Sequence, residues 1–322
     1  MLRFTIPEHI NDFKKQCEFL YEQLDGFFRS DVLEELFSVL ETDEETIEDR
    51  YGARKKADGR VVEVQELGGI ESLEPVRERL YGIFRELGFT DINKPASDRW
   101  DRVVILGGAQ NAIYTRVKGA IRFINPSVMS VDGISCYRPI SPIERGESSF
   151  KAVSDTEFGV MSEVFCSELP VKLTGYTDRF TGDRNINSIS NVRLFQTDVV
   201  SGSQEYRIYA APSSEPGIRR ADTGDSVWFY LDEDGAAPDD RLLFITRNIY
   251  CNRQFLQMFY YMMKRHYINS FDIVGCLSDD ELERKDDYEI LKYIQEVIAL
   301  LSWGRKVMNL TVSRHYVLPD TS

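Results

Sequence analysis

Two hydrophobic patterns alternate along the chain. Short unbroken aliphatic runs, such as Val103 to Leu106 and Leu242 to Ile245, are typical of strands buried on both faces of a parallel sheet. Between them lie longer stretches in which apolar residues recur every three or four positions, the spacing of an amphipathic helix. Strands alternating with helices predict an α/β fold, a Rossmann-like three-layer sandwich with a mostly parallel sheet.

The sheet domain is predicted to span residues 96–322. Its expected strands are 103–106, 133–139, 171–176, 242–246 and 271–276, and its expected helices are 113–124, 156–169, 189–196, 254–266 and 288–307. Residues 197–240 resemble an insertion, within which 206–212 has the composition of a strand.

The first 95 residues are predicted to form a helical segment packed on this domain. Residues 7–40 have the pattern of two helices, with Ser30 and Asp31 as suitable N-caps of the second. Residues 42–64 are highly charged and indicate a solvated connection or a short charged helix. A further amphipathic helix is expected from Leu73 to Leu87, ended by Gly88.

The composition of the chain disfavours several classes of function. The 322 residues include 39 basic and 53 acidic side chains, a net charge of -14, which disfavours binding to nucleic acid or to an anionic membrane. No run of 18 apolar residues and no signal peptide is present, so we expect a cytoplasmic protein. The five cysteines lack CxxC spacing, and the three histidines lack metal-ligand spacing, so reduced thiols and no metal site are expected.

The stretch that organises the chain is the glycine turn after the first core strand. Gly107 and Gly108 would let backbone amides approach a phosphate or carboxylate, or would simply form a tight turn into the helix. Gln110 and Asn111 begin that helix and would contact a ligand or cap the helix. Arg116, two turns further on, is expected in a surface salt bridge or on the ligand.

Four motifs in order resemble those of domain-of-unknown-function family 218, the YdcF/SanA/ElyC-like proteins, over roughly residues 98 to 276. They are Leu106-Gly-Gly108 with Arg116 and Ala120, Glu157 with Met161, Asn187-Ser-Ile-Ser-Asn191, and Ile245-Thr246 with Arg253. The chain departs from the family where Ser135-Cys-Tyr-Arg138 replaces a Ser-Gly-Gly turn, Ser190 replaces a glutamate, and Tyr250 replaces a histidine. The resemblance implies a Rossmann-like fold. It is closest to the cytosolic YdcF-like members, one of which has been connected with S-adenosylmethionine.

The matched motifs follow strand ends, so folding is expected to gather them at one edge of the sheet. If the guanidinium groups of Arg138, Arg247 and Arg253 converge there, an anionic ligand is favoured over structural ion pairing. The candidate ligand-binding residues are Gly107, Gly108, Gln110, Asn111, Arg116, Tyr137, Arg138, Asn187, Asn191, Thr246, Arg247, Tyr250 and Arg253, with Arg184, Arg219 and Arg220 as further members. Asn187 and Asn191 are expected one helical turn apart, either facing the cleft or capping the helix. Glu157 is the candidate acid/base, and Cys136, Cys251 and Cys276 are expected to be buried thiols.

The leading hypothesis is therefore a metal-independent protein that binds a phosphorylated or nucleotide-like small molecule at the strand ends. If it is an enzyme, phosphoryl or pyrophosphoryl chemistry is favoured. One alternative is an S-adenosylmethionine-binding, methyltransferase-like protein. The other is a non-enzymatic partner-binding protein, with an interface on the N-terminal helices and residues 197–240.

Overall fold

The computed structural model describes most of the chain in two compact units, Met1–Asn93 with Asn248–Leu256 and Leu277–Ser322, and Lys94–Arg247 with Gln257–Cys276. Within these bounds it describes residues 1–7, 10, 12–52, 73–182, 185–198, 204–233, 235–265, 270–276 and 287–314.

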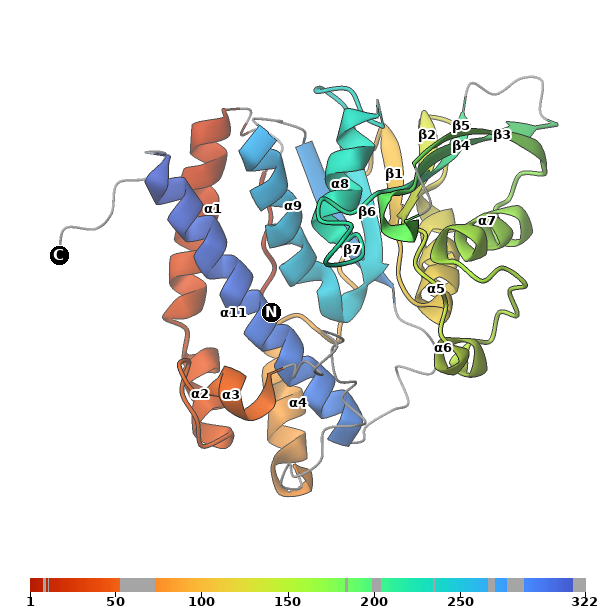
Figure 1. Cartoon of the computed structure of the whole chain (residues 1–322). Coiled ribbons are helices and arrows are strands. Elements are labelled where there is room, and N and C mark those ends of the chain that lie inside the picture. Colours follow the sequence, from red (N-terminus) through yellow and green to blue (C-terminus); the bar gives the residue numbers. More distant parts are fainter. Residues whose placement is uncertain are drawn as a thin grey trace. The chain divides into compact units, whose positions relative to one another are not determined.

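The second unit contains a seven-stranded sheet in the order β3-β4-β5-β2-β1-β6-β7 (Figure 1). The five strands from β5 to β7 are parallel, and β3 and β4 form an antiparallel hairpin added beside β5. The strands are β1 (Arg102–Leu106), β2 (Ser130–Ser135), β3 (Leu173–Thr181), β4 (Ser190–Thr197), β5 (Glu205–Ala210), β6 (Arg241–Arg247) and β7 (Ser270–Cys276).

Helices cover both faces of this sheet, which gives a Rossmann-like three-layer α/β fold. Helices α5 (Gln110–Ala120) and α7 (Glu157–Glu168) pack against each other on one face, and α8 (Thr223–Asp232) packs on β2 and β5. Two consecutive residues of β2 show that α8 and α7 lie on opposite faces of the sheet. Asp132 accepts a hydrogen bond from Tyr230 of α8, whereas the Cα of Gly133 lies against Met161 and Phe165 of α7. The short helix α6 (Pro142–Glu147) precedes α7.

Helix α9 (Cys251–Arg265) begins in the first unit and ends in the second. Its later residues belong to the layer that contains α8. The ring of Tyr261 meets that of Trp228 edge to face at 5.1 Å, and Trp228 Nε1 donates to the Tyr261 carbonyl oxygen.

The first unit is helical. It contains α1 (Phe13–Phe28), α2 (Asp31–Val39), α3 (Ile47–Tyr51), α4 (Arg77–Glu86), the short turn η5 (Asn248–Tyr250) and the long helix α11 (Asp287–Ser313). Stacked rings of Phe84, Phe89 and Tyr293 join α4 to α11. Gly88 ends the α4 segment at φ 75°, a conformation that glycine tolerates. The predicted N-terminal helices are therefore confirmed, and α11, expected in the sheet domain, belongs to this unit instead.

The predictions for the hairpin and its surroundings need correction. Residues 189–196, predicted as a helix, form strand β4, in which every second side chain faces α7, as in the stacking of Phe195 on Phe165. Residues 197–240 contain β5 and α8, so much of this stretch is part of the sheet and its cover rather than an insertion. The third strand is longer and more exposed than expected, because β3 lies at the edge of the sheet.

The other predicted strands and helices are found with shifted ends; α9 and α11, for example, start at Cys251 and Asp287. The charged connection from 53 to 64 and the helix end at His266 fall outside the described residues. Within the described part of the chain, no helix combines the length and the apolar character needed to cross a membrane.

Candidate functional site

The strand order places several predicted residues at one edge of the sheet. In chain order the five parallel strands lie as third, second, first, fourth and fifth, so the direction of winding reverses between β1 and β6. Ligands of open α/β sheets bind outside the carboxyl ends of strands at such a switch point. Gly107 follows β1 and Thr246–Arg247 ends β6, and β1 and β6 are neighbours in parallel register. The expectation that these two turns share one edge is therefore met.

Glu157 occupies a buried position at this edge, at the start of α7. The Thr156 side chain caps the helix by accepting from the Gly159 amide, and the Glu157 amide donates to the Arg138 carbonyl oxygen at 2.9 Å. The Glu157 carboxylate lies directly against Gly107. A Cβ at position 107 would overlap a Glu157 oxygen and approach the Ile134 carbonyl oxygen to 2.7 Å. Gly107 thus makes room for a carboxylate of the protein itself, and its own amide donates to Ile134.

The Glu157 carboxylate forms an ion pair with Arg138. Arg138 Nε lies 2.5 Å from Glu157 Oε2, and Arg138 Nη1 lies 3.0 Å from a Glu144 oxygen. Burial raises the pKa of Glu157 above its ordinary value, and the charge of Arg138 opposes that rise. Glu144 is itself fixed by the capping box it forms with Ser141 at the start of α6. Arg138 therefore serves as the counter-ion of two carboxylates.

Arg116 is buried and stabilises the turn after β1. Its Nη1 donates to the carbonyl oxygens of Leu106, at 2.9 Å, and Gly107. A Cβ on Gly108 would lie 3.0 Å from the same nitrogen, so this glycine lets the guanidinium pack against the backbone. The expectation of a surface salt bridge for Arg116 is wrong, because only 2% of the residue is exposed.

The start of α5 has no side-chain cap. Its N-cap is Ala109, and no side chain accepts from its first amides in the described structure. Gln110 is buried and donates to the Phe150 carbonyl oxygen, whereas Asn111 is half-buried and accepts from Ser149 Oγ at 3.5 Å. Neither predicted residue acts as the cap.

The loop after β5 brings Arg220 to this edge. Ala211 and Ala221 pack with Cys136, which follows β2. Arg220 is exposed, and its positive charge acts on both Glu157 and Cys136. Its neighbour Arg219 instead pairs with a carboxylate at the start of α8, its Nη1 lying 2.5 Å from Asp225 Oδ2. Arg220, a further member of the predicted ligand site, thus reaches this edge from a loop within residues 197–240, the stretch expected to be an insertion.

The two predicted asparagines support this edge from the hairpin side. Asn187 lies in the short turn η4 (Ile186–Ser188); its Nδ2 donates to the Pro216 carbonyl oxygen at 3.2 Å, and its own carbonyl accepts from the Ser213 amide. Asn191 lies in β4 and its Nδ2 donates to the Tyr137 hydroxyl at 3.2 Å. The predicted spacing of one helical turn between the asparagines is wrong, because β4 is a strand. Tyr137 stacks on Phe158, with ring centroids 5.0 Å apart.

The remaining predicted residues lie at or after the end of β6. Thr246 is fully buried, and its carbonyl oxygen accepts from Cys276 Sγ at 2.9 Å. Burial raises the pKa of Cys276 to about 11, although the charges of Arg116 and Arg247 oppose the rise. Arg247 is partly buried.

Tyr250 and Arg253 belong to the first unit. Arg253 Nε lies 2.6 Å from Glu296 Oε2, and its guanidinium lies over the Tyr250 ring at 5.3 Å. Arg253, like Arg138, thus has a carboxylate partner within its own unit.

The remaining candidates for site chemistry among the described residues are the cysteine thiols and the side chains that could bind a metal. Burial raises the pKa of Cys136 to about 12, so its thiol is protonated at neutral pH. All five cysteines, each within the described residues, are free. Within the described ranges, no three histidine, cysteine or carboxylate side chains come together as a metal site. The predicted contributor Arg184 and the three histidines lie outside those ranges.

Comparison with known proteins finds only a short similarity. The chain is 32% identical over 95 residues to outer capsid protein P3 of Rice dwarf virus, in both the Fujian and the Akita isolates. The match covers 28% of this chain and 9% of the viral protein, so the chain spans a small fraction of the relatives that it matches. No protein-family model matches the chain, and no solved structure matches it.

Proposed function

We propose that the carboxyl edge of the sheet binds a small anionic molecule, phosphorylated or nucleotide-like, with Arg220 as its principal charged contact. The observation that carries the proposal is the state of Arg220. It is exposed beside the Glu157–Arg138 pair, and none of the carboxylates that the structure describes forms an ion pair with it. Arg138 and Arg219 are both neutralised at the same edge. In a chain with a net charge of -14, an arginine without an acid partner is suited to an external anion.

The neighbouring groups support the same assignment. The uncapped amides at the start of α5 and the positive end of this helix favour negative charge near the turn after β1. Arg247 adds a guanidinium at the end of the adjacent strand. The resemblance to family 218, with its motifs at these strand ends, agrees with a ligand at this place, and we propose membership of that family on the same grounds.

If the site is catalytic, the chemistry that it favours is phosphoryl or pyrophosphoryl transfer or hydrolysis. Guanidinium groups and helix amides stabilise charge that develops on phosphate oxygens. Glu157 is our candidate acid/base, because burial raises its pKa above the ordinary value of a carboxyl group, the direction that general acid/base catalysis requires. Its pairing with Arg138 works against that role, so Glu157→Gln would distinguish a catalytic from a structural carboxylate.

Calorimetry with Arg220→Gln tests the binding proposal. Nucleoside diphosphates, a sugar nucleotide and inorganic pyrophosphate are titrated into the wild-type chain, and a ligand that binds is titrated into the variant. Losing a charge-assisted contact should weaken binding by about tenfold to a hundredfold. Arg85→Gln is the matched control, because Arg85 is also exposed but lies on α4 in the first unit.

The same titrations distinguish the anion site from the alternative, a site for S-adenosylmethionine. S-adenosylmethionine has no phosphate, and its sulfonium, ammonium and carboxylate groups give it a net positive charge, so removing the positive charge of Arg220 should not weaken its binding. If it binds the wild-type chain and Arg220→Gln alike while no phosphorylated ligand binds, the anion-site proposal is wrong. Equal weakening by Arg85→Gln would likewise contradict it, because the effect would then be one of net charge.

A further inference from the structure

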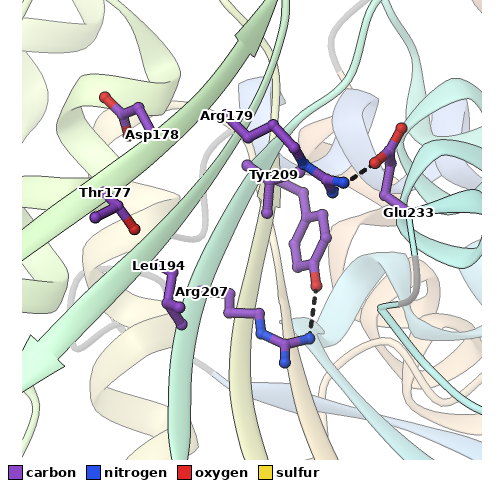
Figure 2. Close-up of a pocket in the computed structure, with 8 residues that line it drawn as sticks. Thr177, Asp178, Arg179, Leu194, Arg207, Tyr209 and Glu233 are labelled. Carbon is purple, nitrogen blue, oxygen red and sulfur yellow. Dashed lines mark hydrogen bonds and ion pairs between the residues drawn. The ribbon is translucent and has the colours of Figure 1, made fainter.

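A hollow lies away from the strand ends, on the face of the hairpin beside α8 (Figure 2). It is an open hollow with a volume of about 340 Å³, within the range of small-molecule sites. It is lined by Thr177, Asp178 and Arg179 of β3, Val192 and Leu194 of β4, Arg207 and Tyr209 of β5, and Glu233 after α8. We call it the hairpin groove.

The strand register explains how the groove is built. Leu194 of β4 stands between Thr177 and Arg207, and Val192 stands between Arg179 and Tyr209. The two aliphatic side chains therefore form the floor, and the two arginines stand at diagonal corners on the flanking strands. Strands two places apart are separated by about 10 Å, a gap that two arginine side chains can close from both sides. In Figure 2 Arg179 extends to Glu233 and Arg207 extends to the Tyr209 hydroxyl, and the Tyr209 ring lies between the two arginines.

Both guanidinium groups have partners that an anion could replace. Arg179 Nη2 lies 2.5 Å from Glu233 Oε2, with the two side chains 63% and 33% exposed. Arg207 pairs with Glu205, which is 46% exposed, and Arg207 Nη1 donates to the Tyr209 hydroxyl at 3.2 Å. Both ion pairs include partly exposed side chains, and such pairs contribute little to stability, so a bound anion can replace the carboxylates at small cost.

Neither Tyr209 nor Asp178 occupies the arginines of the groove as a competing anion. Burial raises the pKa of Tyr209, so the phenol stays neutral and positions Arg207 without competing as an anion. Asp178 faces the opposite side of the sheet, where Arg193 Nε and Nη2 hold its two oxygens at 2.8 and 2.7 Å. The acid that competes for Arg179 within the groove is therefore Glu233.

We propose that the hairpin groove binds a small organic phosphate monoester. Arg179 and Arg207 hold the phosphate from two sides, and Val192 and Leu194 lie under the uncharged part of the molecule. This ligand places two negative charges between two guanidinium groups and an apolar body over an apolar floor. The site is independent of the strand-end site, from which it differs in every lining residue.

Isothermal titration with three probes tests the two halves of the site: phenyl phosphate, inorganic phosphate and phenol. Phenyl phosphate should bind about tenfold more tightly than inorganic phosphate, because only the former covers the floor. Arg207→Gln and Arg179→Gln should each weaken phenyl phosphate binding by about tenfold. Glu233→Gln should tighten it about two- to fivefold, because the variant removes the competitor for Arg179.

Arg220→Gln is the control that separates this site from the strand-end site. Phenyl phosphate affinity that is unchanged in Arg220→Gln and lost in Arg207→Gln supports the groove. Affinity lost in Arg220→Gln and kept in Arg207→Gln would overturn the groove proposal while supporting the strand-end site. No binding of phenyl phosphate to the wild-type chain, or weaker binding in Glu233→Gln, would also overturn it. The Glu233→Gln result stands even if an arginine variant fails to fold, since Glu233 lies after the end of α8.

Discussion

Asp132 offers the sharpest test of the electrostatics inside the sheet domain. It lies in the middle of β2 with no exposed surface, and its Oδ2 accepts from the Ser130 and Tyr230 hydroxyls at 2.7 and 2.9 Å. The positive charges of Arg102 and Arg207 oppose a rise in the pKa of Asp132, but Arg102 Nε is paired with Asp240. Burial therefore dominates and raises the pKa of Asp132 from its ordinary 3.8 to about 6.

The direction of the pH effect follows from this raised pKa. Between about pH 4 and pH 6 the folded chain keeps a proton on Asp132 that the unfolded chain has lost, so this residue makes stability fall as pH rises. Below about pH 3 Asp132 is protonated in both states, so its burial costs no stability; well above pH 6 it is ionised in both states and the cost is complete. The difference between 3.8 and about 6 corresponds to about 3 kcal/mol.

Asp132→Asn removes the titration and keeps the shape. The variant carries its own constant cost, because the new amide needs an acceptor, but that cost does not depend on pH. The free energy of unfolding of the variant minus that of the wild type should therefore increase by about 2.4 kcal/mol between pH 4 and pH 7.5, because at pH 4 the unfolded chain has already lost part of the proton. Urea titrations followed by tryptophan fluorescence measure it, since Trp100 and Trp228 lie in the sheet domain.

Asp101→Asn is the control with the opposite sign. Although partial burial raises the pKa of Asp101, hydrogen bonds from Arg241 outweigh it and the pKa is lowered, so this variant should lose stability relative to the wild type as pH rises. A difference for Asp132→Asn that stays constant from pH 4 to pH 7.5, or that decreases, would refute the argument. It would mean that Asp132 is solvated or better paired than its contacts indicate.

Two further variants test the edge of the sheet, and a third tests which thiol is accessible. Gly107→Ala should lower the free energy of unfolding by about 1–3 kcal/mol in urea titrations, since a methyl group there overlaps the Glu157 carboxylate; an unchanged midpoint would show that the carboxylate can move away. Arg138→Met should lower the free energy of unfolding by about 3–5 kcal/mol at pH 7, because it leaves the Glu157 carboxylate buried without its paired cation. This loss of stability should shrink as pH falls and Glu157 is protonated. A loss of stability that does not depend on pH would contradict the pairing. All five cysteines are described, and Cys166 is the exposed one, so it should be the single thiol that reacts rapidly with an aromatic disulfide reagent in the native chain. Cys166→Ser should abolish this rapid phase. A rapid phase that survives in the variant would show that another thiol is accessible.

The sequence predicted the parallel core well because its signals are local. Unbroken aliphatic runs such as Val103 to Leu106 require burial on both faces, and the helix at 156–169 has both its cap, Thr156, and its apolar spacing. The hairpin was harder to predict. Ser190–Thr197 mixes polar and apolar residues at a spacing that suits either a short helix or a strand, and only its pairing with β3 and β5 makes it a strand.

By itself, then, the sequence determined the α/β class, the position of the glycine turn and the acidic surface, because each depends on neighbouring residues or on composition. Tertiary structure decided what each charged side chain does. Arg116 and Arg138 are separated in sequence from the groups they bind, Arg138 by 19 residues from Glu157, and no local pattern records such a distance. The same holds for Arg179 and Arg207, which flank a common floor only because β4 runs between their strands. An ion pair or a ligand contact depends on which groups folding brings within a few ångströms, and that is a property of the packed chain.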